Sequence, residues 1–95
     1  MRALSLALPA LVLTLAAHAA EAGCYADYKA KKDNPLQLQY GVAEIAGDCT
    51  AEAARAELAP RLAADGWQLL EVMDTFDESG LDGRRASAGD YFLRY

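Results

Sequence analysis

The sequence predicts an α+β domain, in which a small antiparallel sheet of three or four strands carries one helix on one face. Three observations predict this fold class. Residues 36–42 alternate apolar and polar side chains, which is the period of a half-buried strand. Apolar residues then recur at helical spacing over residues 54–62, and Gly66 follows where a helix commonly ends. Two further apolar segments, residues 67–76 and 91–95, complete a β-α-β-β core, with an extra N-terminal edge strand before it.

Residues 1–19 predict a secretory signal peptide, which leaves residues 20–95 as a single small domain. Arg2 precedes an apolar run over residues 3–17, and Ala17-His18-Ala19 provides the small-x-small pattern of a signal-peptidase site. We therefore expect an exported protein, either periplasmic or secreted.

Two other interpretations of this segment are disfavoured. The apolar run is shorter than the roughly 20 residues that span a bilayer, and Pro9 interrupts it. A lipoprotein signal ending at Cys24 requires an aliphatic residue where Glu21 stands. We therefore expect no membrane partner after cleavage.

Cleavage changes the chemistry that the chain can perform. It removes Arg2 and His18, so the net charge moves from −5 to −6 and no histidine remains. The mature chain would then lack the commonest metal ligand and general base, and Ser79 and Ser87 would have no histidine to activate them. Nucleic acid is disfavoured as a partner because it requires a basic face. We expect a protein that is not an enzyme and holds no cofactor or metal.

The two cysteines, Cys24 and Cys49, predict one disulfide, because an even pair in a small exported domain is most often a bridge. Closing a loop of about 25 residues stabilises a fold by roughly 3–3.5 kcal/mol in the chain-entropy model. The alternative of reactive or metal-binding thiols lacks a Cys-x-x-Cys spacing and a histidine.

The N-terminal half of the domain predicts two strands. Residues 21–32 fit either an edge strand or a helical turn, and we favour an edge strand because spaced lysines discourage further strand pairing. Asp33-Asn34-Pro35 then predicts a turn. In residues 36–46 one face is apolar until the alternation slips at Glu44 and Ile45, which predicts a bulge or the end of pairing near residues 41–44. The residues assigned to the apolar face are Leu36, Leu38, Tyr40 and Val42.

The next segment predicts a helix. Thr50 is a suitable N-cap, and Glu52 stands in the first turn, where the helix dipole favours a carboxylate. Pro60 costs about 3 kcal/mol inside a helix, so the helix either kinks or breaks and restarts there. We favour one kinked helix, because the apolar stripe of Ala54, Leu58 and Leu62 keeps its phase up to and past the proline.

The last third of the chain predicts a central strand, a loop and a closing strand. Residues 67–76 are apolar on both parities, which suits a central strand, and Trp67 is expected to pack under the helix. Residues 77–89 are charged, glycine-rich and unpatterned, which predicts a long hairpin loop. Residues 91–95 alternate again and are expected to pair with the strand at 67–76.

The segment Gly66-Trp67-Gln68-Leu69-Leu70 resembles the signature of a family of small bacterial domains of unknown function, which carry a Gly-Trp-Glu-Leu-Val type of turn. The closing segment Tyr91-Phe92-Leu93-Arg94-Tyr95 resembles that family's aromatic and basic final strand. The signal peptide and the cysteine pair depart from the pattern. The resemblance implies a β-α-β-β unit in an exported branch of Gram-negative bacteria, and it implies no activity.

Two classes of function remain after this survey. The first is a non-catalytic module that binds a protein, peptide or small molecule through one sheet face or the 77–89 loop. The second is an uncharacterised enzyme or a metal-dependent accessory protein. An acidic cluster at Asp74, Asp77, Glu78 and Asp82 lacks the spacing of an EF-hand calcium loop. We favour the first class, with an interaction surface that draws on Tyr25, Tyr28, Tyr40, Arg84 and Arg85.

Overall fold

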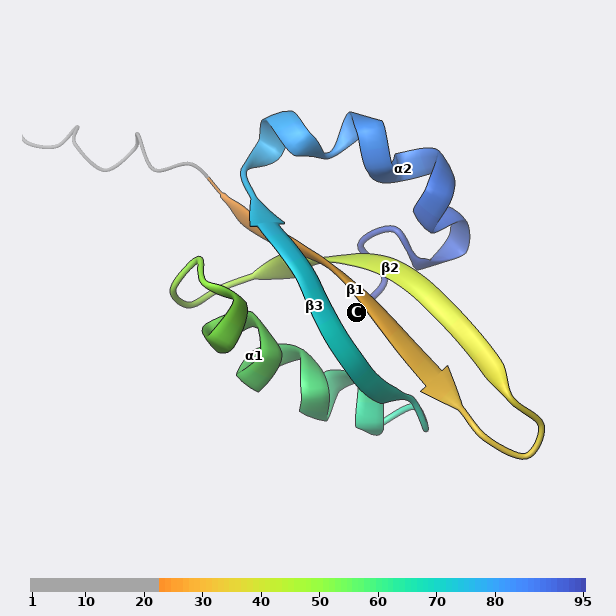
Figure 1. Cartoon of the computed structure of the whole chain (residues 1–95). Helices are drawn as coiled ribbons and strands as arrows, with labels where there is room; N and C mark the ends of the chain where they lie inside the picture. Colours follow the sequence, from red (N-terminus) through yellow and green to blue (C-terminus); the bar gives the residue numbers. More distant parts are fainter. Residues whose placement is uncertain (1–22) are drawn as a thin grey trace, which may run out of the picture.

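The computed structural model describes residues 23–95, which form a three-stranded antiparallel sheet with a helix on each face (Figure 1). The element order is β1 (Cys24–Lys32), β2 (Gln37–Ile45), α1 (Ala51–Ala63), β3 (Gln68–Phe76) and α2 (Asp82–Ala88), with short 3₁₀ turns on either side of α2. The predicted α+β class is therefore confirmed. The predicted signal peptide, residues 1–19, lies outside the described residues.

The strand order is β2-β1-β3, so the N-terminal strand is the central one and β3 is an edge. Both placements correct the sequence-based prediction. β1 is buried on both faces: Ala26 and Tyr28 lie under α1, and Tyr25 and Asp27 face α2. The lysines that suggested an edge strand stand in the second half of β1, where Lys29 is exposed.

Strand β2 pairs with β1 in unbroken register from Cys24↔Ile45 to Lys32↔Gln37, so the predicted bulge near Glu44 is wrong. The apolar–polar alternation in the sequence is interrupted because both faces of this part of the sheet are covered, so apolar residues are needed on both. Ile45 packs in the α1 core, whereas Val42 packs in the cluster beneath α2. Leu36 and Leu38, which we assigned to the buried side with Val42, are exposed.

The irregularities of the sheet lie in β3 instead. The β1–β3 register shifts twice, and each shift leaves one extra residue on β3, Leu70 and Met73. Both side chains are exposed. Together with the exposed carboxylates of Glu71 and Asp74, these bulges make the free edge of β3 a poor template for pairing with another chain.

Helix α1 begins and ends as predicted. Thr50 is the N-cap, and its Oγ1 accepts a hydrogen bond of 3.1 Å from the Ala53 amide. One helix includes Pro60. Gly66 adopts a left-handed conformation with φ 85°, which turns the chain so that the Trp67 amide can bond to the Leu62 carbonyl at 2.9 Å.

The main core lies between α1 and the sheet. Tyr28, Leu58 and Leu62 are fully buried there, and Trp67 joins them as predicted. The ring of Tyr91 meets Trp67 edge-on at a centroid distance of 5.8 Å. A tyrosine from the C-terminal segment thus completes this core.

The predicted closing strand at residues 91–95 is wrong. The segment makes a single parallel bridge, Val42↔Phe92, and it lies beside β2 rather than β3. The Leu93 amide donates to the Val42 carbonyl at 2.8 Å, but φ of Leu93 is 59°, which ends extended structure at once. The aromatic side chains therefore serve packing, not sheet pairing.

The predicted hairpin loop at residues 77–89 is largely helical, which is a further correction. Asp77 caps a 3₁₀ turn by accepting a bond of 2.9 Å from the Ser79 amide, and α2 follows. α2 packs against β2 on the face opposite α1. It buries Ala88 beside Tyr25 and Val42.

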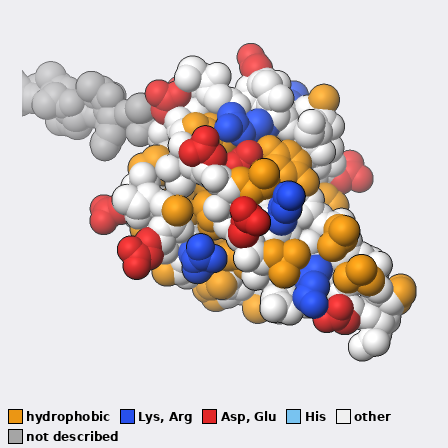
Figure 2. All heavy atoms as spheres, viewed as in Figure 1, with side chains coloured by type: hydrophobic (Ala, Val, Ile, Leu, Met, Phe, Trp, Pro, Cys, Tyr) orange, Lys and Arg blue, Asp and Glu red, His pale blue; other side chains and the backbone are white. Residues whose placement is uncertain are grey.

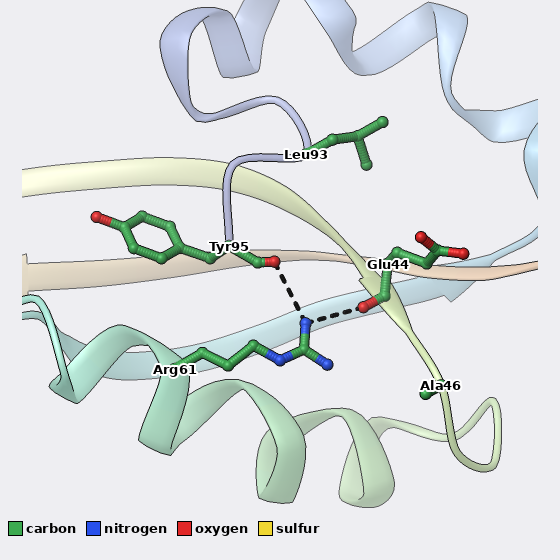
Figure 3. Close-up of a pocket in the computed structure, with 5 residues that line it drawn as sticks. All are labelled: Glu44, Ala46, Arg61, Leu93 and Tyr95. Atoms are coloured by element: carbon green, nitrogen blue, oxygen red, sulfur yellow. Dashed lines mark hydrogen bonds between the residues drawn. The ribbon is translucent and has the colours of Figure 1, made fainter.

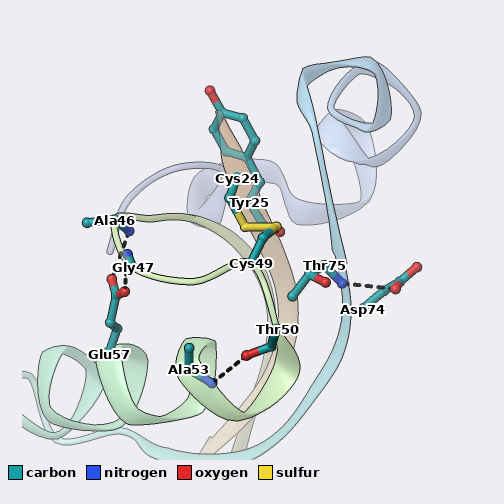
Figure 4. Close-up of a disulfide and its surroundings, with 10 residues drawn as sticks. All are labelled: Cys24, Tyr25, Ala46, Gly47, Cys49, Thr50, Ala53, Glu57, Asp74 and Thr75. Atoms are coloured by element: carbon teal, nitrogen blue, oxygen red, sulfur yellow. Dashed lines mark hydrogen bonds between the residues drawn. A yellow bond between two sulfur atoms is a disulfide. The ribbon is translucent and has the colours of Figure 1, made fainter. Parts of the chain in front are cut away.

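The predicted disulfide Cys24–Cys49 is present, with the two Cα atoms 5.6 Å apart (Figure 4). It joins the first residue of β1 to the residue before the N-cap of α1. Nearby, the Glu57 carboxylate accepts bonds from the amides of Ala46 and Gly47 at 2.9 and 2.6 Å. The loop between β2 and α1 is thus held by Glu57 at its start and by the disulfide at its end. Among residues 23–95, no helix has the length and apolar character of a membrane span.

Candidate functional site

The face of the sheet that carries α2 is only half covered. Beneath α2 the side chains of Tyr25 and Val42 are buried, but further along the same strands Leu38 is 72% exposed. On β3, Leu70 is 44% exposed. Figure 2 shows hydrophobic side chains gathered at this end of the sheet, toward the β1–β2 turn, with basic and acidic groups between them.

These exposed side chains surround a shallow depression of about 310 Å³. The walls of the depression are formed by Lys29, Leu38, Tyr40 and Leu70. We call the surface made by these four residues the open face. Ala30 and Gln39 contribute to the floor, and their side chains belong to the opposite side of the sheet by strand alternation.

Strand register explains how the open face is assembled. Lys29 on β1 pairs directly with Tyr40 on β2, and Leu38 lies two residues along the same face. Leu70 is a bulged residue of β3, which has no direct partner on β1. A bulge redirects a side chain, and here it brings a large apolar group to the depression.

Tyr40 also belongs to a polar network under α2. Its hydroxyl donates to Asp27 Oδ2 at 2.8 Å, and Arg84 Nε donates to the same oxygen at 2.9 Å. Arg84 also donates from Nη1 to the Gly80 carbonyl at 2.9 Å, and its guanidinium lies 3.8 Å from the centroid of the Phe76 ring. Asp27 is only 5% exposed, so this network fixes α2 and the Tyr40 ring relative to β1.

Tyr40 and Arg84 keep their protonation states around neutral pH. Burial, followed by the hydrogen bond to Asp27, raises the pKa of Tyr40 to about 12. The hydrogen bond to Asp27 raises the pKa of Arg84 above its already high value. Tyr40 therefore stays a hydrogen-bond donor and Arg84 a cation. Neither group can exchange a proton with a substrate at pH 7.

The residues predicted to form one interaction surface do not lie together. Tyr25 and Tyr28 are buried on opposite faces of β1, and the hydroxyl of Tyr28 donates to the side chain of Gln39. Arg84 is engaged with Asp27, and Arg85 is exposed, with its guanidinium 4.4 Å from the centroid of the Phe92 ring. Of the five predicted residues, Tyr40 alone belongs to the open face.

The sequence did not indicate that Lys29 and Leu70 line a depression. It also did not indicate that Leu38 is exposed. The alternation in residues 36–42 was visible, but nothing in it shows that α2 covers one end of the face and not the other. Leu70 reaches the depression through a bulge, for which the residue order carries no signal.

The side chains of the acidic cluster are engaged separately rather than gathered around one point. Asp77 accepts bonds from the Ser79 hydroxyl at 2.6 Å and its amide at 2.9 Å, which lower the pKa of Asp77. Asp82 lies 3.6 Å from Arg85, and Asp74 lies 3.7 Å from Arg84. Within residues 23–95 no three carboxylate, cysteine or histidine side chains are placed to hold one ion.

A second concavity of about 420 Å³ surrounds Arg61 (Figure 3). Arg61 Nη1 donates to the carbonyl oxygens of Glu44 and Tyr95 at 3.0 and 3.2 Å, and Nη2 donates to Glu57 at 2.7 Å. The guanidinium is thus occupied in joining α1, β2 and the C-terminal segment. We assign this arrangement to stability rather than to binding.

Comparison with known proteins adds no relative: no protein-family model, curated protein or solved structure matches the chain. The resemblance to small bacterial domains of unknown function therefore stays a prediction.

Proposed function

We propose that the protein is a small exported binding module and that its open face contacts the partner. The observation that carries the proposal is the exposure of Leu38 and Leu70 on the two edge strands that flank β1, at the end of the sheet that α2 does not cover. Apolar side chains that gather in water around a depression, rimmed by polar groups, are typical of an interaction site.

The size and chemistry of the depression suggest the kind of partner. Pockets for small molecules occupy about 300–1,000 Å³ and enclose most of the ligand, whereas this one is at the low end and open on one side. It suits one apolar side chain presented by a peptide or protein. Lys29 stands at the rim and favours an acidic neighbour next to that apolar side chain.

The disulfide supports export. Cys24 and Cys49 are joined, and disulfides persist in oxidising compartments such as the periplasm or the extracellular space. We propose such a compartment for this protein.

Peptide display tests the proposal. A random-peptide library would be selected on the oxidised chain, and enriched peptides would be measured against two variants. Leu38→Lys places a charge on the open face, whereas Leu93→Lys changes a side chain that is as exposed as Leu70 but lies in the Arg61 concavity. We expect Leu38→Lys to weaken binding about tenfold or more, as loss of a central apolar contact does, and Leu93→Lys to bind normally. Peptides that bind both variants equally would place the site elsewhere.

A further inference from the structure

We propose that residues 77–90 form a cover that opens from the sheet, that the Asp27–Arg84 ion pair is its latch, and that an apolar compartment continuous with the open face lies beneath it. The inference rests on the proposed function in one respect: the compartment would lengthen the same binding site.

The first support is the weak packing of α2. It has seven residues, of which only Ala88 is buried. Its N-cap, Leu81, makes no side-chain capping bond, and a Cβ added to Gly83 would meet no atom within 4 Å. A helix this short has little stability of its own, so α2 depends on what holds it to the sheet.

The second support is the latch itself. Arg84 reaches from α2 to a nearly buried carboxylate on the central strand, with 2.9 Å between Arg84 Nε and Asp27 Oδ2. Removing one member of a buried ion pair leaves the other charge without compensation, which is strongly unfavourable. This ion pair therefore holds the cover closed together with Leu81 and Ala88, which pack against the cluster beneath it.

The third support is that both ends of the cover are anchored. On one side Phe76 stacks on Tyr25 at a centroid distance of 6.3 Å. On the other side Tyr91 packs against Trp67 in the main core. Just before that anchor, Gly89 has φ 54°, a left-handed conformation suited to a hinge. Opening can thus be confined to the segment between the anchors while the sheet and α1 stay intact.

The surface under the cover is apolar apart from the Asp27 carboxylate, and it reaches the open face. Tyr25, Val42 and Ala88 form a small cluster, with Phe76 at its edge. Tyr40 packs against this cluster and also borders the depression. With the cover open, the apolar surface would extend from Leu38 to Tyr25, with the Asp27 carboxylate beside it on β1. A partner with two apolar side chains on one extended segment could then occupy both parts.

Native-state hydrogen exchange of the disulfide-intact chain tests the cover without any ligand. Amides that open locally exchange faster than amides that open only on global unfolding. In the wild-type protein we expect α2 amides to exchange at least tenfold faster than the most protected amides of α1 and β1. Equal protection of α2 and α1 would overturn the proposal, and this measurement does not depend on a variant that folds.

Two arginine variants separate the latch from the general charge of α2. Arg84→Met removes the latch, whereas Arg85→Met removes the same charge from the next residue, which contacts Phe92 and not Asp27. We expect Arg84→Met to accelerate α2 exchange about tenfold further, with α1 unchanged, and Arg85→Met to match wild type. Identical exchange in the two variants, or equal acceleration in α1 and α2, would show that Arg84 is not a latch.

A neutral apolar dye, Nile red, reports the compartment. In a Leu38→Lys background, where the open face is disrupted, Arg84→Met should increase dye fluorescence several-fold and Arg85→Met should not. No increase with Arg84→Met would mean that no apolar compartment is uncovered. The exchange and dye results are independent of peptide selection on the open face, so each proposal can fail alone.

Discussion

The Tyr40 hydroxyl donates a hydrogen bond of 2.8 Å to Asp27 Oδ2, across two paired strands on the half-covered face of the sheet. Tyr40 also borders the depression. One side chain thus connects the exposed end of this face to the ion pair that holds α2.

Tyr40→Phe removes this bond and leaves Arg84 as the only donor to Asp27 Oδ2. Loss of a hydrogen bond to a partly buried charged group costs about 1.5–3 kcal/mol, and we expect a decrease in the free energy of unfolding of that order. Urea denaturation measures it. Tyr91→Phe is the matched control, because among residues 23–95 no hydrogen bond involves the Tyr91 hydroxyl. Equal losses in the two variants would contradict the assignment.

Leu38→Lys should leave stability within about 0.5 kcal/mol of wild type, as surface substitutions do, because its side chain is 72% exposed. Leu58→Ala should cost about 2–5 kcal/mol, since Leu58 is fully buried under α1. Thermal denaturation of both variants makes the comparison. A large loss with Leu38→Lys would mean that the open face is part of the core.

Acid should destabilise the fold partly through Glu57. Hydrogen bonds from the Ala46 and Gly47 amides lower the pKa of Glu57 from its usual 4.5. A depressed folded-state pKa contributes stability above pH 4.5 that is lost as the pH falls through the folded-state value. We expect Glu57→Gln to flatten the dependence of unfolding free energy on pH in this range. An unchanged pH profile would argue against this role.

Removal of the disulfide by Cys24→Ser with Cys49→Ser should lower the unfolding free energy by about 3–3.5 kcal/mol, the value for a loop of roughly 25 residues. The melting temperature of the oxidised wild type should fall on reduction toward that of the double variant. The double variant itself should not respond to reductant, which provides the control. A wild-type melting curve that is indifferent to reductant would refute the prediction.

Local signals predicted much of this fold. Thr50 as a cap, Gly66 as a helix stop, Trp67 as a core residue and the Cys24–Cys49 bridge each depend on a few neighbouring residues or on residue type. Such features can be read from the order of residues because their physical cause is local or compositional.

The errors have a common cause in contacts between distant segments. β1 was expected at an edge because of its lysines, but its alanines and tyrosines allow helices on both faces. Residues 77–89 appeared unpatterned, because α2 is held by an ion pair to Asp27 rather than by an apolar stripe. The open face was missed for the same reason, since it exists only where α2 ends.

The central position of β1 has a consequence for the order in which the fold is assembled. β1 and β2 are joined by a short turn, but pairing of β1 with β3 brings Tyr25 to Phe76, across most of the domain. Of the three strands, the central strand β1 is translated first, but it gains its second partner only when β3 is in place. Cys49 precedes β3 in the chain, so oxidation with Cys24 can close the first loop before β3 arrives. Because long-range strand pairing is slow, we expect refolding from the oxidised state to be faster than refolding from the reduced state.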